Sequence, residues 1–119
     1  MCGIAGIIGS RANVETVNIM AQRLRHRGPD GDGVWSERGV ALGHRRLSIL
    51  DLSQGGHQPM VLGPHVLTYN GEIYNHERLR ASLPGPWYSS GDTEVLLHLL
   101  AQRGSAGLEQ LTGMFAFAI

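Results

Sequence analysis

The alternation of apolar and polar residues predicts short strands separated by a few helices. The glycine-bounded run 3–9 is rich in β-branched residues and predicts a buried strand directly after Cys2. Further strands are expected where apolar residues gather between turn residues. They lie at 33–35 and 40–42 (a hairpin around 37–39), at 47–50, at 66–69, at 73–74 and over the apolar run 114–119.

Three segments have the periodicity of helices. Asn13 is a suitable N-cap for a helix from Val14 to about Arg25. A second, short helix is expected from Asn75 to Leu83, and a third runs from Asp92 to about Arg103, with Gly104 ending it. The apolar face of the first helix would carry Val14, Val17, Met20, Ala21 and Leu24. The simplest interpretation of the apolar face of the third helix is that it packs in the hydrophobic core.

Loops are predicted between these elements, at 26–31, 53–64 and 84–90. The pair Asn70-Gly71 predicts a sharp turn, because glycine tolerates positive φ. The chain stops inside its last apolar run, so we expect the domain to continue beyond residue 119 and this stretch to leave a sheet edge exposed.

Composition excludes several function classes. The formal net charge is zero and all ten basic residues are arginine, so neither a nucleic-acid footprint nor a membrane-binding patch nor a catalytic lysine is expected. A single cysteine cannot form an internal disulfide, which fits a reducing compartment, and with no signal peptide we expect a cytoplasmic protein. The six histidines lack metal-binding spacing, so no metal site is expected.

That single cysteine follows one methionine. Removal of Met1 would leave Cys2 with a free α-amine, whose pKa of roughly 7.7–8.0 lets it accept the thiol proton near neutral pH. Nucleophile and base would then belong to one residue. The alternative is that Cys2 is a small buried apolar residue.

Three further segments place polar residues beside apolar strands: 44–51, 69–76 and 90–94. Each has a simple structural explanation when taken alone. Arg46 fits a solvated charge at a rim, Asn70-Gly71 a hairpin turn, and Asp92 a helix N-cap.

Together these segments resemble one family in order and spacing. The opening Cys2-Gly3-Ile4-Ala5-Gly6, the loop 26–30 (His-Arg-Gly-Pro-Asp), Arg-Leu-Ser-Ile-Leu-Asp at 46–51, Asn-Gly-Glu-Ile-Tyr-Asn at 70–75 and Gly-Met-Phe-Ala-Phe-Ala at 113–118 are similar to the N-terminal glutaminase domain of class II glutamine amidotransferases. Within that family the chain most resembles glutamine-dependent asparagine synthetases. Residues 2–119 would be the N-terminal part of such a domain.

The resemblance implies an α+β fold, the four-layer αββα sandwich of antiparallel sheets found in N-terminal-nucleophile hydrolases. It implies that Cys2 attacks the side-chain amide carbon of glutamine, with its α-amine as base and then acid. The side-chain amide of Asn70 and the backbone N–H of Gly71 would form the oxyanion hole, and the loop 26–30 would be structural.

The resemblance also assigns the substrate's charged groups. Arg46 would hold the α-carboxylate, while Arg45 should point the other way by strand alternation. Glu72 and Asp92 would receive the α-ammonium group, and the backbones of Ile49 and Leu50 would line the pocket.

The implied partners are L-glutamine and a C-terminal synthetase domain. The glutaminase part needs no cofactor, whereas ATP and Mg²⁺ belong to the second domain, whose Ser-Gly-Gly-x-Asp-Ser motif this chain lacks. The acceptor substrate stays open, since relatives use other acceptors, and a homodimer is one alternative for the oligomeric state. A non-catalytic module that retains Met1 is the third interpretation, which N-terminal mass analysis would detect.

Overall fold

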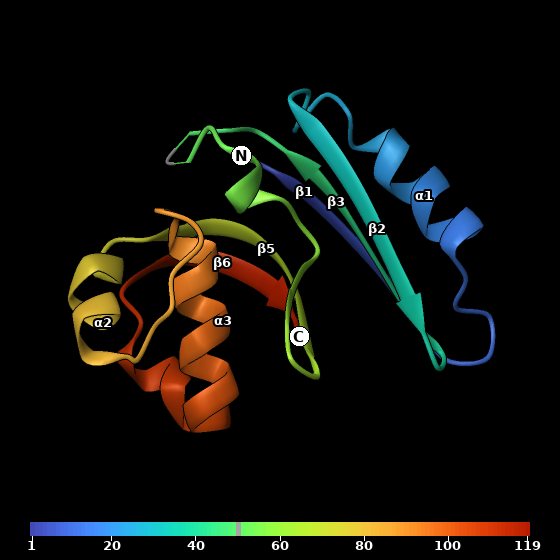
Figure 1. Cartoon of the computed structure of the whole chain (residues 1–119). Coiled ribbons are helices and arrows are strands. Elements are labelled where there is room, and N and C mark those ends of the chain that lie inside the picture. Colours follow the sequence, from blue (N-terminus) through green and yellow to red (C-terminus); the bar gives the residue numbers. More distant parts are fainter. Residues whose placement is uncertain (50) are drawn as a thin grey trace.

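Two antiparallel sheets stack face to face, and helices cover their outer faces (Figure 1). The computed structural model describes residues 1–49 and 51–119. The layers follow the order α1 (Val14–Arg23), the sheet β1-β3-β2, the sheet β4-β5-β6, and finally α2 (His76–Ser82) with α3 (Asp92–Arg103). The predicted α+β class is confirmed, and the arrangement fits the layered sandwich that the family resemblance implies.

The first sheet is organised around its central strand. β3 (Val40–Arg46) pairs with β1 (Gly3–Ile8) on one side and with β2 (Gly31–Glu37) on the other, and the β2–β3 pair confirms the predicted hairpin. Arg38 and Gly39 make the tight turn, with φ values of 47° and 81°. Positive φ at both central residues matches the twist of a two-residue hairpin.

Helix α1 begins where predicted, because the Asn13 side chain accepts a hydrogen bond from the Thr16 N–H at 2.8 Å. Its contact face is narrower than the sequence indicated. Val17 and Ala21 are buried against β3, whereas Val14 and Met20 are exposed. The helix therefore covers the sheet with two small side chains that allow close approach.

The second sheet corrects the turn predicted at Asn70-Gly71. Both residues lie inside the nine-residue strand β5 (His65–Ile73), opposite Ala116 and Phe115 of β6 (Gly113–Ala118). Gly71 is not among the glycines with positive φ. Pairing with β6, more than forty residues away in sequence, overrides the local turn preference of the dipeptide.

Other boundaries also differ from the sequence prediction. Residues 47–49 are not in a strand, and Leu50 lies outside the described residues. The predicted loop 53–64 contains a short 3-10 helix (Gln54–Gly56) and the strand β4 (Met60–Leu62), which exists because it pairs with β5. Tyr74, predicted to be extended, lies in a turn. The unpredicted segment η2 (Gly104–Gln110) is a 3-10 helix, beginning at the glycine that ends α3 with φ 54°.

The main hydrophobic core lies between the second sheet and α3. Helix α3 is buried from Asp92 to Leu100 because sheet, α2 and η2 surround it. The core of this half comprises Leu67, Tyr69, Ile73, Leu79, Leu83, Val95, Leu96, Leu97, Leu99 and Leu100. The prediction that the apolar residues of α3 are core is confirmed.

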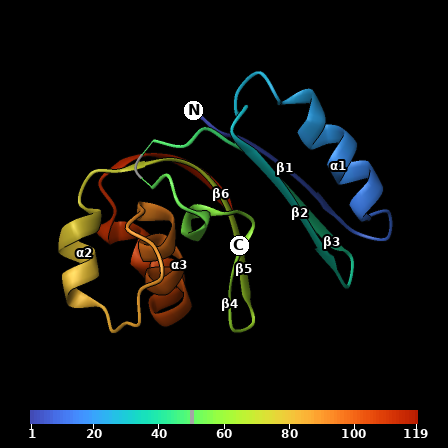
Figure 2. The same ribbon diagram turned by 45° about the horizontal axis from the view of Figure 1, so that its top comes forward.

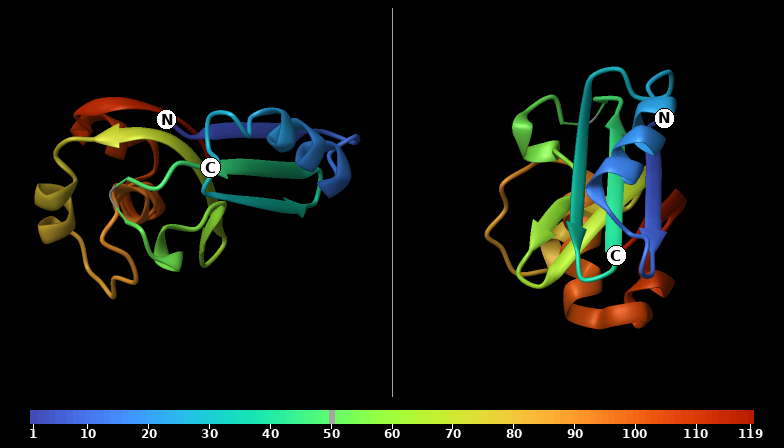
Figure 3. Two further views of the ribbon diagram at one scale, coloured as in Figure 1. Left: turned by 90° about the horizontal axis from the view of Figure 1, so that it is seen from above. Right: turned by 90° about the vertical axis from the view of Figure 1, so that its right-hand side faces the viewer.

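The N-terminus lies between the two halves of the molecule (Figures 2 and 3). It enters β1 beside the region where β5 and β6 run past the first sheet. Among the described residues, no helix is long and apolar enough to cross a membrane.

Candidate active site

A pocket opens where the start of β1, the end of β3, the middle of β5 and the start of α3 meet. Seven of the predicted site residues line it: Cys2, Arg46, Ile49, Asn70, Gly71, Glu72 and Asp92. The eighth, Leu50, lies outside the described residues. The fold thus brings together residues up to ninety positions apart in sequence.

Cys2 stands directly before β1 and is half-buried. Its Sγ lies 3.4 Å from the Leu47 N–H nitrogen and 3.7 Å from the Leu47 carbonyl oxygen, while Arg27 donates a hydrogen bond to the Cys2 carbonyl at 3.0 Å. Met1 also lines the pocket and is 59% exposed. Leu47 therefore contacts the thiol and Arg27 holds the Cys2 backbone, while the methionine that blocks the α-amine is accessible.

The loop at residues 26–30 contacts the N-terminus through Arg27 and the end of β3 through Gly28. A side chain at Gly28 would collide with the Arg45 backbone, and the Arg45 guanidinium donates to the Gly28 carbonyl at 3.1 Å. Arg45 also pairs with Asp32 at 3.1 Å and does not line the pocket. Strand alternation therefore distinguished Arg45 from Arg46 correctly, and the loop's contacts are structural.

Arg46 is held at the rim by the chain that follows it. Its guanidinium donates to the Ser53 carbonyl at 2.8 Å and to the Asp51 carbonyl, and it lies so close to Gly56 that a Cβ there would overlap it. A guanidinium has five N–H donors, so donors remain for a bidentate carboxylate. The alternative of a freely solvated rim charge is wrong.

Asn70 and Gly71 present their polar groups from the middle of β5. Within the described part of the chain, the buried Asn70 side-chain oxygen has no hydrogen-bond partner, so this amide has unused bonding capacity in the pocket. A Cβ at Gly71 would collide with the Met114 carbonyl and lie 2.6 Å from the Phe115 Cα. Glycine is required here by the approach of β6 as well as by any ligand.

Asp92 is the first residue of α3, and the N-cap is Gly91, so the predicted capping role is wrong. Instead, its Oδ2 accepts hydrogen bonds from the Tyr69 hydroxyl at 2.7 Å and the Ile73 N–H at 2.9 Å. Burial and the adjacent Asp92 carboxylate raise the pKa of Tyr69, which keeps its hydroxyl a donor. Because both bonds reach one oxygen, Oδ1 is left for a ligand.

The pocket wall also contains residues that sequence analysis did not assign. Gln58, two residues before β4, accepts from the Tyr69 N–H at 2.6 Å and donates to the Thr93 hydroxyl at 3.3 Å, so it connects β5 to α3. Nothing local marks Gln58, since its partners are distant in sequence. Tyr69 and Thr93 belong to the polar segments singled out by the sequence, but their partners were not predictable.

Asp51 connects two loops of the wall. It accepts hydrogen bonds from the Ser53 N–H at 2.7 Å and the Ser90 N–H at 3.0 Å. Hydrogen bonding from Ser53 is the main cause that lowers the pKa of the Asp51 carboxyl, opposed by burial and assisted by Ser90 and Arg46. Asp51 is therefore an ionised link between the Arg46 side and the α3 side of the pocket.

The pocket lining combines a thiol, one guanidinium and three carboxylates; that of Asp51 is already hydrogen-bonded to Ser53 and Ser90, which leaves those of Glu72 and Asp92 for a ligand. An α-amino acid carries one carboxylate and one ammonium group, so this set matches both charges and leaves the thiol for a reactive side chain. Among residues 1–49 and 51–119, no cluster of three or more histidine, cysteine, aspartate or glutamate residues could hold a metal ion.

Comparison with known proteins agrees with this chemistry. The model of a glutamine amidotransferase domain matches residues 1–119. The chain is 41% identical to a glutamine-hydrolysing asparagine synthetase of Asparagus officinalis, and 38% and 39% identical to those of Bacillus subtilis and Escherichia coli. Each match covers all of this chain but only 21–23% of the relative, so the chain spans about a fifth of the length of these relatives.

Proposed function

Since the chain belongs to the glutamine amidotransferase domain family, we propose that its pocket binds L-glutamine and hydrolyses the side-chain amide to give glutamate and ammonia. The observation that carries this proposal is the convergence of Cys2, Arg46 and Asp92 on one pocket. Cys2 and Arg46 come from the first sheet and Asp92 from α3, and together they have the groups that a zwitterionic amide substrate needs.

In the proposed reaction, Cys2 Sγ attacks the amide carbon and its proton passes to the α-amine freed by loss of Met1. The amine returns that proton to the leaving nitrogen, the C–N bond breaks, and ammonia departs from a glutamyl thioester. Water then hydrolyses the thioester. Met1 lines the pocket, so its removal would also enlarge the space beside the thiol.

The negative charge that develops on the amide oxygen needs donors. We assign this role to the Asn70 side-chain NH₂ and the Gly71 backbone N–H, which both lie on the pocket-lining part of β5. Loss of one oxyanion donor typically costs roughly 3–4 kcal/mol of transition-state stabilisation.

The two ends of the pocket would recognise the amino-acid part of glutamine. Arg46 binds the α-carboxylate, with the backbones of Ile49 and Leu50 alongside, and Asp92 Oδ1 with Glu72 receives the α-ammonium group. The fixed positions of Arg46 and Asp92 support this assignment, because each already has part of its hydrogen bonding satisfied by the protein.

For the parent protein, we propose that the ammonia serves ATP-dependent conversion of aspartate to asparagine in the cytoplasm. This rests on the names of the relatives, which are glutamine-hydrolysing asparagine synthetases. ATP and Mg²⁺ would act in a C-terminal synthetase domain that receives the ammonia. Another acceptor would keep the same glutaminase chemistry.

The decisive experiment measures glutamate and ammonia release from L-glutamine by the wild-type chain and by Cys2→Ala. Mass spectrometry establishes whether Met1 has been removed. We expect release from the processed chain and a loss of at least about a thousandfold in Cys2→Ala, since no other thiol is present. Equal activity in both proteins, or none in a folded chain lacking Met1, would contradict the proposal.

A further inference from the structure

The segment 88–91 forms part of the pocket wall although it belongs to neither a helix nor a strand. Ser89 and Gly91 line the pocket next to Asp92. An irregular segment has no ladder of backbone hydrogen bonds to fix it, so its groups must find other partners. In this segment the partners are buried or half-buried side chains.

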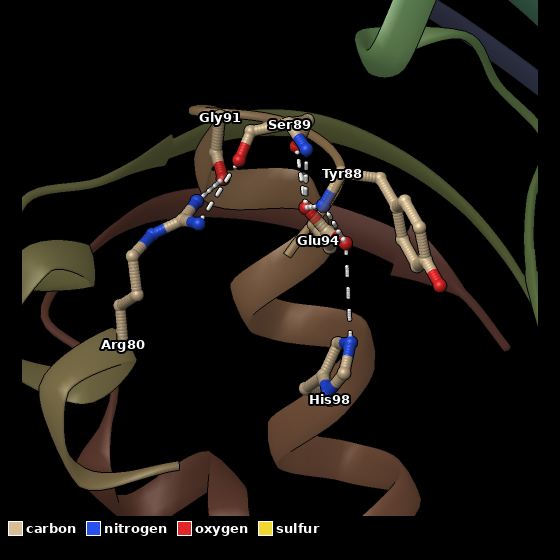
Figure 4. Close-up of polar contacts among 6 residues, drawn as sticks. All are labelled: Arg80, Tyr88, Ser89, Gly91, Glu94 and His98. Carbon is tan, nitrogen blue, oxygen red and sulfur yellow. Dashed lines mark hydrogen bonds and ion pairs between the residues drawn. The ribbon is translucent and has the colours of Figure 1, made fainter. Parts of the chain in front are cut away.

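Glu94 holds the segment from the helix side (Figure 4). Glu94 is only 4% exposed, and its carboxylate accepts from the Tyr88 N–H at 2.9 Å, the Ser89 N–H at 2.8 Å and the Ser89 hydroxyl at 2.8 Å. Hydrogen bonds to a carboxylate are stronger than those between neutral groups. One side chain therefore fixes two consecutive residues of the wall.

Arg80 holds the same segment from the opposite side (Figure 4). From α2, its Nη1 donates to the Ser89 carbonyl at 2.9 Å and its Nη2 donates to the Gly91 carbonyl at 2.8 Å. The Trp87 ring lies 4.4 Å from the guanidinium carbon and restricts it further. Ser89 thus donates its N–H to Glu94 and accepts at its carbonyl from Arg80, so both sides of this residue are held.

The hydrogen-bond network around residues 88–91 extends to the other end of the pocket through Asp51. Asp51 accepts the Ser90 N–H, and the Asp51 carbonyl accepts from the Arg46 guanidinium. The wall that precedes Asp92 is therefore connected to the loop that holds Arg46. Displacing residues 88–91 would change the relation between the two groups assigned to the α-carboxylate and the α-ammonium.

We propose that Glu94 and Arg80 are positioning residues for glutamine recognition, which fix residues 88–91 and thereby set the binding site for the amino-acid end of the substrate. This inference rests on the proposed glutaminase function. Neither residue lines the pocket, so both act through the wall. Their loss should weaken substrate binding and leave the reactivity of Cys2 intact.

The main test is Glu94→Gln, which keeps the shape but replaces one acceptor oxygen by an NH₂ group. We expect the KM for L-glutamine to rise at least tenfold with kcat within threefold of wild type. Arg80→Lys should raise KM less, since one ammonium group cannot reproduce the two-carbonyl fork. Glu109→Gln makes the same chemical change at an exposed residue of η2 and should leave both parameters unchanged.

Two alkylating reagents separate positioning from general damage. Labelling of Cys2 by 6-diazo-5-oxo-L-norleucine, which carries an amino-acid end, should slow at least tenfold in Glu94→Gln, whereas labelling by iodoacetamide should change less than twofold. Amide hydrogen exchange at Tyr88 and Ser89 should accelerate while β1 and β3 stay protected. An unchanged KM, or equal slowing with both reagents together with faster exchange everywhere, would overturn the inference.

Failure of the proposed glutaminase function would give a different experimental result from failure of this inference. It appears in the wild-type protein, as glutamate release no greater than that of Cys2→Ala. Binding of L-glutamine to Cys2→Ala, with and without Glu94→Gln, then decides the inference without catalysis. Tenfold weaker binding in the double variant supports it, and equal binding or no binding overturns it.

Discussion

The two halves of the molecule hold their site residues in different ways. In the half formed by α1 and the sheet β1-β3-β2, Cys2 directly precedes β1 and Arg46 ends β3, each next to the terminal pair of Gly3 with Arg45. In the other half, Asp92 depends on Tyr69 and Ile73 for its position, and the wall beside it depends on Glu94 and Arg80. The first half relies on backbone pairing, whereas the second adds buried side chains around Asp92 to the β5–β6 pairing that places Asn70 and Gly71.

The halves also differ in their cores. The buried cluster around α3 contains ten hydrophobic residues, whereas α1 contributes only Val17 and Ala21 as buried contacts on the first sheet. A polar network such as that around Asp92 and Glu94 keeps its geometry only if the elements that carry it are well fixed. The richer core thus lies in the half whose site depends on side-chain networks.

The largest expected effect tests this difference in packing. Leu96→Ala, at a fully buried position of α3, should lower the free energy of unfolding by about 3–4 kcal/mol through lost burial and a cavity. Val17→Ala, equally buried on α1, should cost about 2 kcal/mol. Urea denaturation of both variants gives the two values. A larger loss for Val17→Ala would contradict the view that α3 carries the main core.

The interface between the halves should be sensitive to pH through His44. This residue of β3 is 1% exposed, and burial lowers its pKa from 6.5 to about 4, with Arg45, Arg46 and His57 adding to the effect. Because the unfolded chain binds the proton more readily, stability should fall as pH drops from about 6.5 to 4, by up to roughly 3 kcal/mol.

His44 reaches the other sheet through a 3.1 Å contact between its Nε2 and the Tyr69 carbonyl. His44→Gln should flatten the loss of stability between pH 6.5 and 4, while His65→Gln, at the start of β5, should retain it. Urea titrations at several pH values measure the slopes. The same slope in wild type and His44→Gln would show that other groups cause the acid sensitivity.

The binding residues of the two halves should respond differently to conservative change. Asp92→Asn should raise the KM for glutamine about 30-fold, or roughly 2 kcal/mol, and also lower stability by about 1 kcal/mol, because its carboxylate serves Tyr69 and Ile73. Arg46→Lys should raise KM similarly but change stability by less than about 0.5 kcal/mol. Steady-state kinetics gives the KM values, and urea denaturation gives the stability losses. Equal stability losses in the two variants would contradict this prediction.

The smallest effect concerns the start of α1. Asn13→Ala removes the acceptor for the Thr16 N–H and should lower stability by about 1 kcal/mol without altering glutamine hydrolysis. Asn13→Asp, which keeps an acceptor, serves as the matched control. A change in KM for Asn13→Ala would mean that α1 is connected to the pocket more closely than the contacts indicate.

Local sequence alone determined much of the first half and of the helices. The cap at Asn13, the hairpin turn at 38–39 and the stop at Gly104 depend on residues that are neighbours in the chain, and all three are found. The motifs that mark the family identified Cys2, Arg46, Asn70, Gly71, Glu72 and Asp92, and the fold places them in one pocket.

Tertiary structure decided the features whose causes lie far apart in sequence. Asn70-Gly71 lies in a strand and not a turn because β6 pairs with it, and Asp92 faces the Tyr69 hydroxyl because β5 lies beside the start of α3. Gln58 joined the pocket wall without any local signal. Turn and capping preferences amount to about 1 kcal/mol, so pairing and burial of distant segments readily override them.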